Sequence, residues 1–189
     1  MQNNNYEVIE FEDTEAFRVW IDKNHRTTSG IWLKLHKKSS GLTSISYAEA
    51  LDIALCFGWI DGMRRSYDDF SFLQKITPRR PRSLWSKRNI EHVTRLIDKG
   101  LMTSAGLEEV ERAQADGRWA TAYDGPSTMT FSKSFLAELN KYPEAEAYFN
   151  SLTKSARFTI GLQLQTAKTQ KTLEARQARA IQKLLDKTH

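Results

Sequence analysis

The sequence contains a single cysteine, Cys56, and no long hydrophobic run. One cysteine cannot form an internal disulfide, and alone it cannot supply a structural zinc site. No window approaches the roughly 18 consecutive apolar residues that a membrane-spanning helix needs. The first ten residues have neither a basic segment nor an apolar segment of the kind found in secretory signals. We therefore expect a cytoplasmic protein without a membrane span.

Several enzyme signatures are also missing. The chain has no glycine-rich phosphate loop, no His-Glu-x-x-His and no Gly-x-Ser-x-Gly. Its four histidines show no metal-ligand spacing with one another or with Cys56. We expect no cofactor and no metal site, and an enzyme is the less favoured interpretation.

The residues that are present suffice for a folded core, and their charge is uneven. With 189 residues, 40% of them hydrophobic, the chain can form one domain, or one domain with a helical appendage. The net charge is −2 over residues 1–60, +5 over 61–100, −4 over 101–149 and +6 over 150–189. The blocks either attract one another within the fold or build an anion-binding surface from the two basic ones.

The first part of the chain alternates strand and helix patterns. Ser46 and Glu49 form a capping box, and the helix that follows is apolar nearly all round, which predicts a buried helix with Leu51 and Leu55 in the core. Cys56 is expected in the core and His36 on a wetter strand face. Strands are predicted over residues 7–11, 30–38, 59–67 and 70–77. Further helices are predicted after Asp13 or Thr14, after Ser83, and over residues 103–115.

The second part of the chain is expected to be helical. Residues 120–130 lack periodicity and contain Gly-Pro, which indicates a linker. Helices are predicted from Ser132, Pro143, Thr153 and about Thr172. The fold class expected is α+β: a small antiparallel sheet packed with helices, followed by an all-helical C-terminal module. The corresponding domains are 1–119, a linker at 120–130, and 131–189.

One stretch concentrates tryptophans, arginines and a carboxylate. Gly58 and Gly62 flank Trp59 and Asp61, and Pro78 and Pro81 hold Arg79 and Arg80 in extended chain. A helix expected at Ser83 would place its N-terminus within two residues of Arg82, where anions are favoured. We hypothesise a ligand-binding cleft, the alternative being that the tryptophans are core and Asp61 is a buried ion-pair partner. The residues assigned to this cleft are Trp59, Asp61, Arg79, Arg80, Trp85, Ser86 and Asn89.

The same stretch carries a family resemblance. The sequences Ala54-Leu-Cys-Phe-Gly-Trp-Ile-Asp-Gly62, Pro78-Arg-Arg80 and Ser83-Leu-Trp-Ser-Lys-Arg-Asn89 resemble those of the bacterial YdeI/OmpD-associated, or bacteriocin-protection, proteins. Residues from about 8 to 119 look like the α+β domain of that family, which is similar to the frataxin-like YdhG/YjbR fold. Residues from about 131 to 186 resemble its helical C-terminal module. The resemblance implies a role in resistance to bacteriocins or other stress, and it assigns no catalytic residues.

The chain departs from the family pattern near its end. The module usually has Ala-Lys followed by Glu-Thr-Arg, whereas this chain has Ala167-Lys168 followed by Lys171-Thr172-Leu173. Frataxin-like proteins hold iron on an acidic edge, and the acidic residues of 7–15 could do so or could simply favour a helix start.

Three functions remain in competition. The favoured one is a non-enzymatic binding module for an anionic small molecule or peptide, with the oligomeric state left open. The second is an enzyme that uses Asp61 as an acid or base in the cleft. The third is a nucleic-acid-binding protein that uses the two basic blocks.

Overall fold

The computed structural model describes residues 6–188, which divide into two compact units. The first unit runs to Ser83 and takes in Glu91–Trp119. The second unit comprises Leu84–Ile90 and everything from Ala120 onward. Among the described residues, no helix has the length and apolar character needed to cross a membrane.

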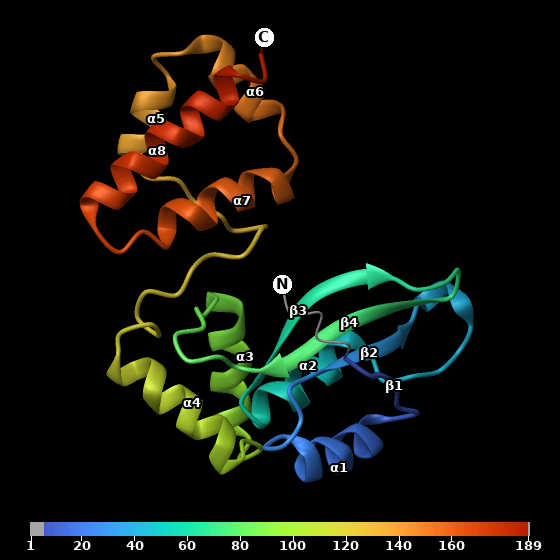
Figure 1. Ribbon diagram of the computed structural model, residues 1–189. Coiled ribbons are helices and arrows are strands. Elements are labelled where there is room, and N and C mark those ends of the chain that lie inside the picture. Colours follow the sequence, from blue (N-terminus) through green and yellow to red (C-terminus); the bar gives the residue numbers. More distant parts are fainter. Residues whose placement is uncertain (1–5, 189) are drawn as a thin grey trace. The chain divides into compact units, whose positions relative to one another are not determined.

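The first unit is built on a four-stranded sheet (Figure 1). Its strands have the order β1-β2-β4-β3: β1 (Val8–Glu10), β2 (Ile31–His36), β4 (Ser71–Pro78) and β3 (Trp59–Ser66). The pairs β2–β4 and β3–β4 are antiparallel, whereas β1 adds to β2 in parallel. A register shift between Asp61 and Arg64 interrupts the β3–β4 ladder. The predicted α+β fold with a helical C-terminal part is confirmed, and the parallel edge pair makes the sheet mixed.

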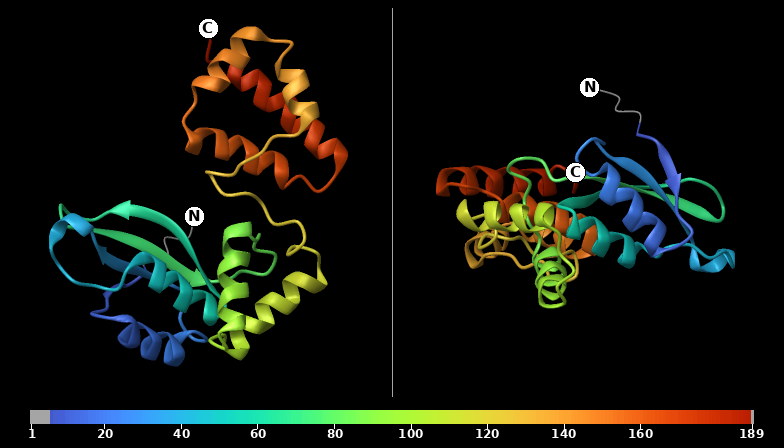
Figure 2. Two further views of the ribbon diagram at one scale, coloured as in Figure 1. Left: turned by 180° about the vertical axis from the view of Figure 1, so that it is seen from behind. Right: turned by 90° about the horizontal axis from the view of Figure 1, so that it is seen from below.

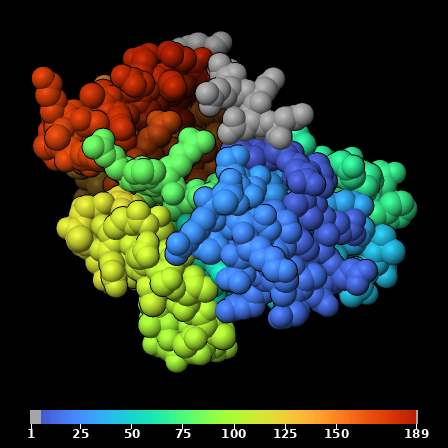
Figure 3. Space-filling model, turned by 60° about the horizontal axis from the view of Figure 1, so that its bottom comes forward, coloured from blue at the N-terminus to red at the C-terminus, as the bar shows by residue number. Residues whose placement is uncertain are grey.

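Helices cover one face of this sheet. The unit contains α1 (Thr14–Asn24), α2 (Tyr47–Cys56), the larger part of α3 (Lys87–Asp98), and α4 (Ser104–Ala115), with a short 3-10 turn η1 (Lys38–Ser40). The sequence sets the helix starts, because Asp13 accepts a hydrogen bond from the Ala16 amide and Ser46 forms the expected capping box with Glu49. Helices α1 and α2 lie on the same side of the strands (Figures 1 and 2). In the space-filling view, the described N-terminal part of the chain forms one continuous patch of the surface of this unit (Figure 3, blue).

The alternation of β2 separates the two faces of the sheet. Ile31, Leu33 and Leu35 are almost fully buried, and they point to the helix side. Trp32, Lys34 and His36 alternate with them and point to the opposite face, where they are half-buried. Leu51 and Leu55 of α2 are 1% and 2% exposed, so the prediction that they belong to the core is confirmed.

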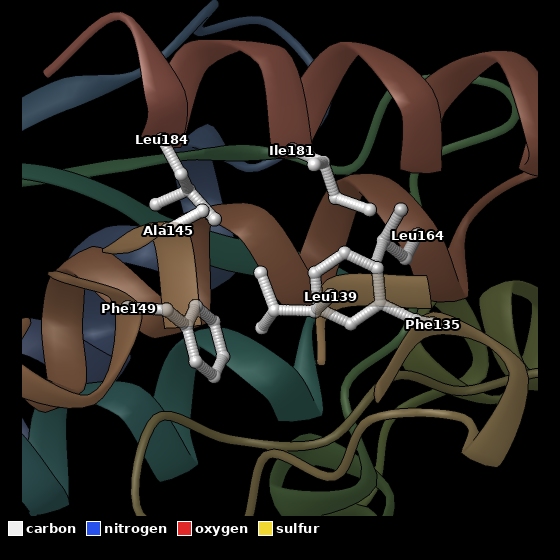
Figure 4. Packing of buried hydrophobic residues seen from close by; sticks show 7 residues of the cluster. All are labelled: Phe135, Leu139, Ala145, Phe149, Leu164, Ile181 and Leu184. Atoms are coloured by element: carbon white, nitrogen blue, oxygen red, sulfur yellow. The ribbon is translucent and has the colours of Figure 1, made fainter. Parts of the chain in front are cut away.

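The second unit is helical from residue 133 onward (Figure 1). It contains α5 (Lys133–Leu139), α6 (Pro143–Ser151), α7 (Lys154–Gln165) and α8 (Gln170–Leu185). Ser132 and Thr153 cap helices as predicted, and Pro143 begins α6. Figure 4 shows the core, to which all four helices contribute. Its buried residues are Phe135, Leu139, Ala145, Phe149, Leu164, Ile181 and Leu184.

One local prediction was wrong. Helix α3 begins at Lys87, and the hydroxyl of Ser86, not that of Ser83, accepts the hydrogen bond from the Asn89 amide at 3.1 Å. Ser83 instead closes a turn, because its hydroxyl accepts from the Arg80 amide at 3.0 Å. His36 lies on the strand face where it was expected; its side chain is 9% exposed, and its Nε2 lies 2.6 Å from Glu10.

Candidate functional site

The predicted cleft residues of the first unit are mostly covered. Trp59 is 1% exposed, and its indole donates to the His25 carbonyl at 3.2 Å. Arg79 is 5% exposed and therefore buried, whereas Arg80 is exposed. Asp61 is half-buried and accepts a hydrogen bond from the Tyr47 hydroxyl at 2.7 Å. These residues contribute more to the packing around the start of β3 than to an open surface.

The remaining cleft residues belong to the second unit. Trp85 is 2% exposed, and its carbonyl accepts from the Tyr123 amide at 3.0 Å. Ser86 pairs with Tyr123 in an isolated bridge, and Ser86 and Asn89 together form the N-terminal cap of α3. Because the seven predicted residues divide between the two units, their convergence on one surface stays a prediction.

The arginine segment is not attached to a helix N-terminus. The chain turns between Arg80 and Ser83, with Arg82 in the left-handed conformation at φ 69°, and α3 starts only at Lys87. The expectation that a helix N-terminus within two residues of Arg82 favours the same anion is therefore wrong, since the dipole effect is confined to the first turn of a helix. The reason is that both Ser83 and Ser86 are suitable caps, and tertiary contacts select the later one.

A second basic surface lies on the sheet face opposite α1 and α2. The register sets Trp32 beside Lys75, and Lys34 and Arg65 on either side of Leu73. Residues directly opposite one another on neighbouring strands project from the same face. We call this the outer face, and define it by Tyr6, Trp32, Lys34, His36, Arg65, Tyr67 and Lys75.

Each cation of the outer face stands over an aromatic ring. The Arg65 guanidinium lies 4.1 Å from the centroid of Trp32, and the Lys75 ammonium lies 4.4 Å from that of Tyr6. Lys34 stands 5.8 Å from the centroid of Tyr67. Such pairs contribute about 0.5–1 kcal/mol each at exposed sites, and they hold long flexible side chains in place.

The carboxylate of Glu10 offsets part of the positive charge of the outer face. Glu10 lies beside Lys34 in the β1–β2 register, and its oxygens lie 2.9 Å from the Lys34 ammonium and 2.6 Å from His36. The hydrogen bond from Lys34, assisted by that from His36, lowers the pKa of Glu10, and the same pairing raises the pKa of Lys34. Arg65 and Lys75 lie farther along the face, each over its ring, and they are the cations that can meet an anionic ligand.

Two neighbouring arginines of the edge strand β3 project to opposite faces of the sheet. Arg64 neighbours Arg65 in sequence but projects to the helix side, where its guanidinium lies 3.6 Å from the centroid of Phe72. The alternation of Trp32, Lys34 and His36 pointed to a polar face from sequence alone. The partners from β3 could not be identified, because the register shift after Asp61 decides which arginine reaches that face.

A separate ionic cluster lies between α2 and α3 in the first unit. Arg95 donates to both Asp52 oxygens at 2.7 Å, and the His92 Nδ1 lies 2.7 Å from the same carboxylate. Burial raises the pKa of Asp52, but the hydrogen bonds from Arg95 and His92 outweigh it, so the pKa lies below its usual value. Asp52 borders a 320 Å³ cavity that Cys56 also lines.

Cys56 is a core residue, as expected. It is 1% exposed, and burial raises the pKa of its thiol. A raised pKa disfavours the thiolate, which is the reactive form, so this cysteine is unsuited to nucleophilic attack. Among residues 6–188, no group of three or more histidine, cysteine and acidic side chains is arranged to hold a metal ion.

Comparison with known families gives two matches. Residues 9–109, more than half of the chain, match the model of a family described as a domain of unknown function (DUF8412). Residues 128–187 match the model described as "Bacteriocin-protection, YdeI or OmpD-Associated". No curated protein and no solved structure matches the chain significantly. The chain therefore belongs to the family of this domain of unknown function, and its helical C-terminal part is a YdeI/OmpD-associated module.

Proposed function

We propose that this protein is a non-enzymatic binding module for an anionic ligand, and that the outer face of the sheet receives the ligand. The observation that carries the proposal is that Arg65 and Lys75 are each held over an aromatic ring on one sheet face. A cation held in place loses less side-chain entropy when it binds, so the free energy of its interaction with an anion is better retained.

The ligand proposed is a small molecule or peptide with phosphate or carboxylate groups. A second candidate, single-stranded nucleic acid, is favoured by one contact: the guanidinium of Arg65 lies 4.1 Å from the Trp32 ring centroid. Nucleobases stack on guanidinium planes and aromatic rings, and phosphates add a salt-dependent attraction to neighbouring cations. Protection against bacteriocins, which the description of the C-terminal family names, enters the proposal as a consequence of binding, not of catalysis.

Calorimetric titration of the full chain tests the proposal. Tripolyphosphate serves as a compact anion, and an oligothymidylate of about 12 nucleotides serves as the single strand. We expect the double substitution Arg65→Ala and Lys75→Ala to weaken binding about tenfold or more. The matched control is Arg64→Ala, which removes the same side chain from the other face of the same strand and should change binding less than about twofold.

The outcomes separate the two candidates. Binding of both probes with similar affinity supports a general anion site, whereas tighter binding of the oligothymidylate, with affinity that falls steeply with salt, supports nucleic acid. The proposal is overturned if neither probe binds at low salt, or if Arg64→Ala weakens binding as much as the double substitution does.

A further inference from the structure

A groove between α7 and α8 of the second unit has an unusual distribution of charge. Its volume is 370 Å³, and most of its exposed lining is apolar. Its lining residues are Leu152, Ala156, Thr159, Ile160, Gln163, Arg179, Ala180, Lys183, Leu184 and Lys187. This set contains three cations and no carboxylate.

The cations line one side of the groove. Arg179 and Lys183 are one turn apart on α8, and Lys187 follows in the turn after the helix. All three are exposed, and in the described chain no hydrogen bond or ion pair joins their charged groups to another residue. One helical turn rises about 5.4 Å, so Arg179 and Lys183, with Lys187 in the following turn, form a short basic row beside the groove.

The floor of the groove is recessed. Leu184 is 3% exposed and belongs to the core, and Leu152, Ile160 and Ala180 pack against that core while remaining partly accessible. A membrane-binding surface needs protruding apolar side chains that reach between lipids. A recessed apolar strip between two helices instead matches the groove into which an amphipathic helix inserts its apolar stripe.

The opposite flank of α8 shows that this charge distribution is not a general property of the helix. A 480 Å³ groove there is lined by Glu138 and Glu174 and contains no cation. The two flanks of one helix thus differ in charge, and only the α7–α8 flank combines an apolar floor with a basic edge.

We propose that the α7–α8 groove binds an amphipathic helix of a partner protein, with acidic residues beside the apolar stripe of that helix. The apolar stripe would cover the floor at Ile160 and Ala180, and the carboxylates would pair with Arg179, Lys183 and Lys187. The inference goes beyond the proposed anion site, since it concerns the other unit and a macromolecular partner.

Fluorescence anisotropy with the full chain tests this inference. The probe is a labelled designed helix of about 15 residues with leucines at i, i+3, i+4 and i+7 and glutamates beside them; a second probe has lysines in place of the glutamates. We expect the acidic probe to bind and the basic probe to bind at least about tenfold more weakly. Lys183→Glu should weaken binding of the acidic probe about tenfold, whereas Lys171→Glu, on the same helix but outside the groove, should change it less than about twofold.

The same measurements can overturn the inference. Equal binding of the two probes would mean that charge does not select the partner, and equal loss with Lys171→Glu would mean that only the net charge matters. Binding of phosphatidylglycerol vesicles without binding of the acidic probe would assign the groove to lipid. Self-association of the chain that Lys183→Glu abolishes, again without probe binding, would assign the groove to a second copy. Thermal melting of each variant verifies that the fold is retained.

Discussion

The two units of this chain keep their structure in different ways. The first unit builds a core around a sheet, and its largest fully buried side chains include Trp59, Phe17 and Ile21. The second unit has a smaller core, and beside it lies a buried carboxylate, Asp124, whose side chain is 5% exposed. Each unit thus combines an apolar core with a hydrogen-bonded carboxylate, but the side chain of Asp52 in the first unit is 25% exposed, whereas that of Asp124 is buried.

Asp124 joins three parts of the second unit that are distant in sequence. Its carboxylate accepts hydrogen bonds from the Lys87 ammonium at 2.6 Å, from the Gln165 amide group at 2.7 Å, and from the Thr130 hydroxyl at 2.8 Å. Lys87 begins α3, Thr130 precedes α5 and Gln165 ends α7. The segment around residue 124 thus has fixed contacts within its own unit. Packing defects should therefore affect both units, and acid should weaken the second unit through Asp124.

The largest effects on stability are expected from truncating buried side chains in the two cores. Leu51 and Leu139 are each 1% exposed, one in each unit, so Leu51→Ala and Leu139→Ala should each reduce the free energy of unfolding by about 2–5 kcal/mol. Hydrogen exchange should assign each loss to the unit that carries the substitution. The matched controls are Leu107→Ala and Leu136→Ala, at 37% and 39% exposure, which should cost less than about 1 kcal/mol. A loss below that level at both buried positions would show that the cores are misplaced.

The next effect is the pH dependence that Asp124 gives to the stability of the second unit. Burial raises the pKa of Asp124, but its hydrogen bonds outweigh this and hold the pKa well below its usual range. The ionised carboxylate therefore stabilises the folded unit above the ordinary aspartate pKa of about 4, and this contribution is lost as the pH falls below it. Asp124→Ala should cost about 3 kcal/mol at neutral pH, because several bonds to a buried charge are lost together.

Urea unfolding of the natural chain and of Asp124→Ala at a series of pH values measures this contribution. The difference in unfolding free energy should shrink steadily as the solution is acidified. The control is Asp116→Ala, an exposed aspartate of the first unit that pairs with Arg118, whose effect should be under about 1 kcal/mol. A difference for Asp124→Ala that does not change with pH would mean that the carboxylate acts only by filling space.

Local chemistry explains which features could be predicted from the sequence. A cap needs only a short polar side chain and a free amide a few residues later, so Ser46, Ser132 and Thr153 were identified correctly. Ser83 failed because two serines three residues apart met the same local criterion. Features that rest on long-range geometry could not be predicted in this way.

The outer face and the Asp124 network are two such features. Arg65 reaches Trp32 only because of a register shift in β3. No short sequence motif predicts that shift. Asp124 lies in a segment without periodicity, and two of its partners, Lys87 and Gln165, are 37 and 41 residues away. The tryptophans and arginines that drew attention in the sequence are conspicuous by residue type, but residue type does not distinguish a buried Trp59 from a half-buried Trp32.

The smallest effects should come from two buried helix glycines, one in each unit. Gly106 in α4 lies against α2, and a Cβ there would collide with the backbone carbonyl of Cys56. Gly161 in α7 lies against Met129, and the three atoms nearest to a Cβ there all belong to that flexible side chain. Alanine stabilises a helix interior by about 1 kcal/mol relative to glycine. Whether each substitution raises or lowers the free energy of unfolding therefore depends on the neighbour that the new Cβ meets.

Gly106→Ala should therefore destabilise the first unit by about 1–3 kcal/mol, since the backbone of α2 cannot move aside without disturbing the core. Gly161→Ala should change the stability of the second unit by less than about 1 kcal/mol, because Met129 can adopt another rotamer. Combining Gly161→Ala with Met129→Ala removes the collision and should reveal the gain in helix propensity, as a rise in the denaturation midpoint relative to Met129→Ala alone. If Gly161→Ala proved as damaging as Gly106→Ala, Met129 would be as fixed in place as a backbone carbonyl, and the segment before α5 would be packed as tightly as the sheet unit.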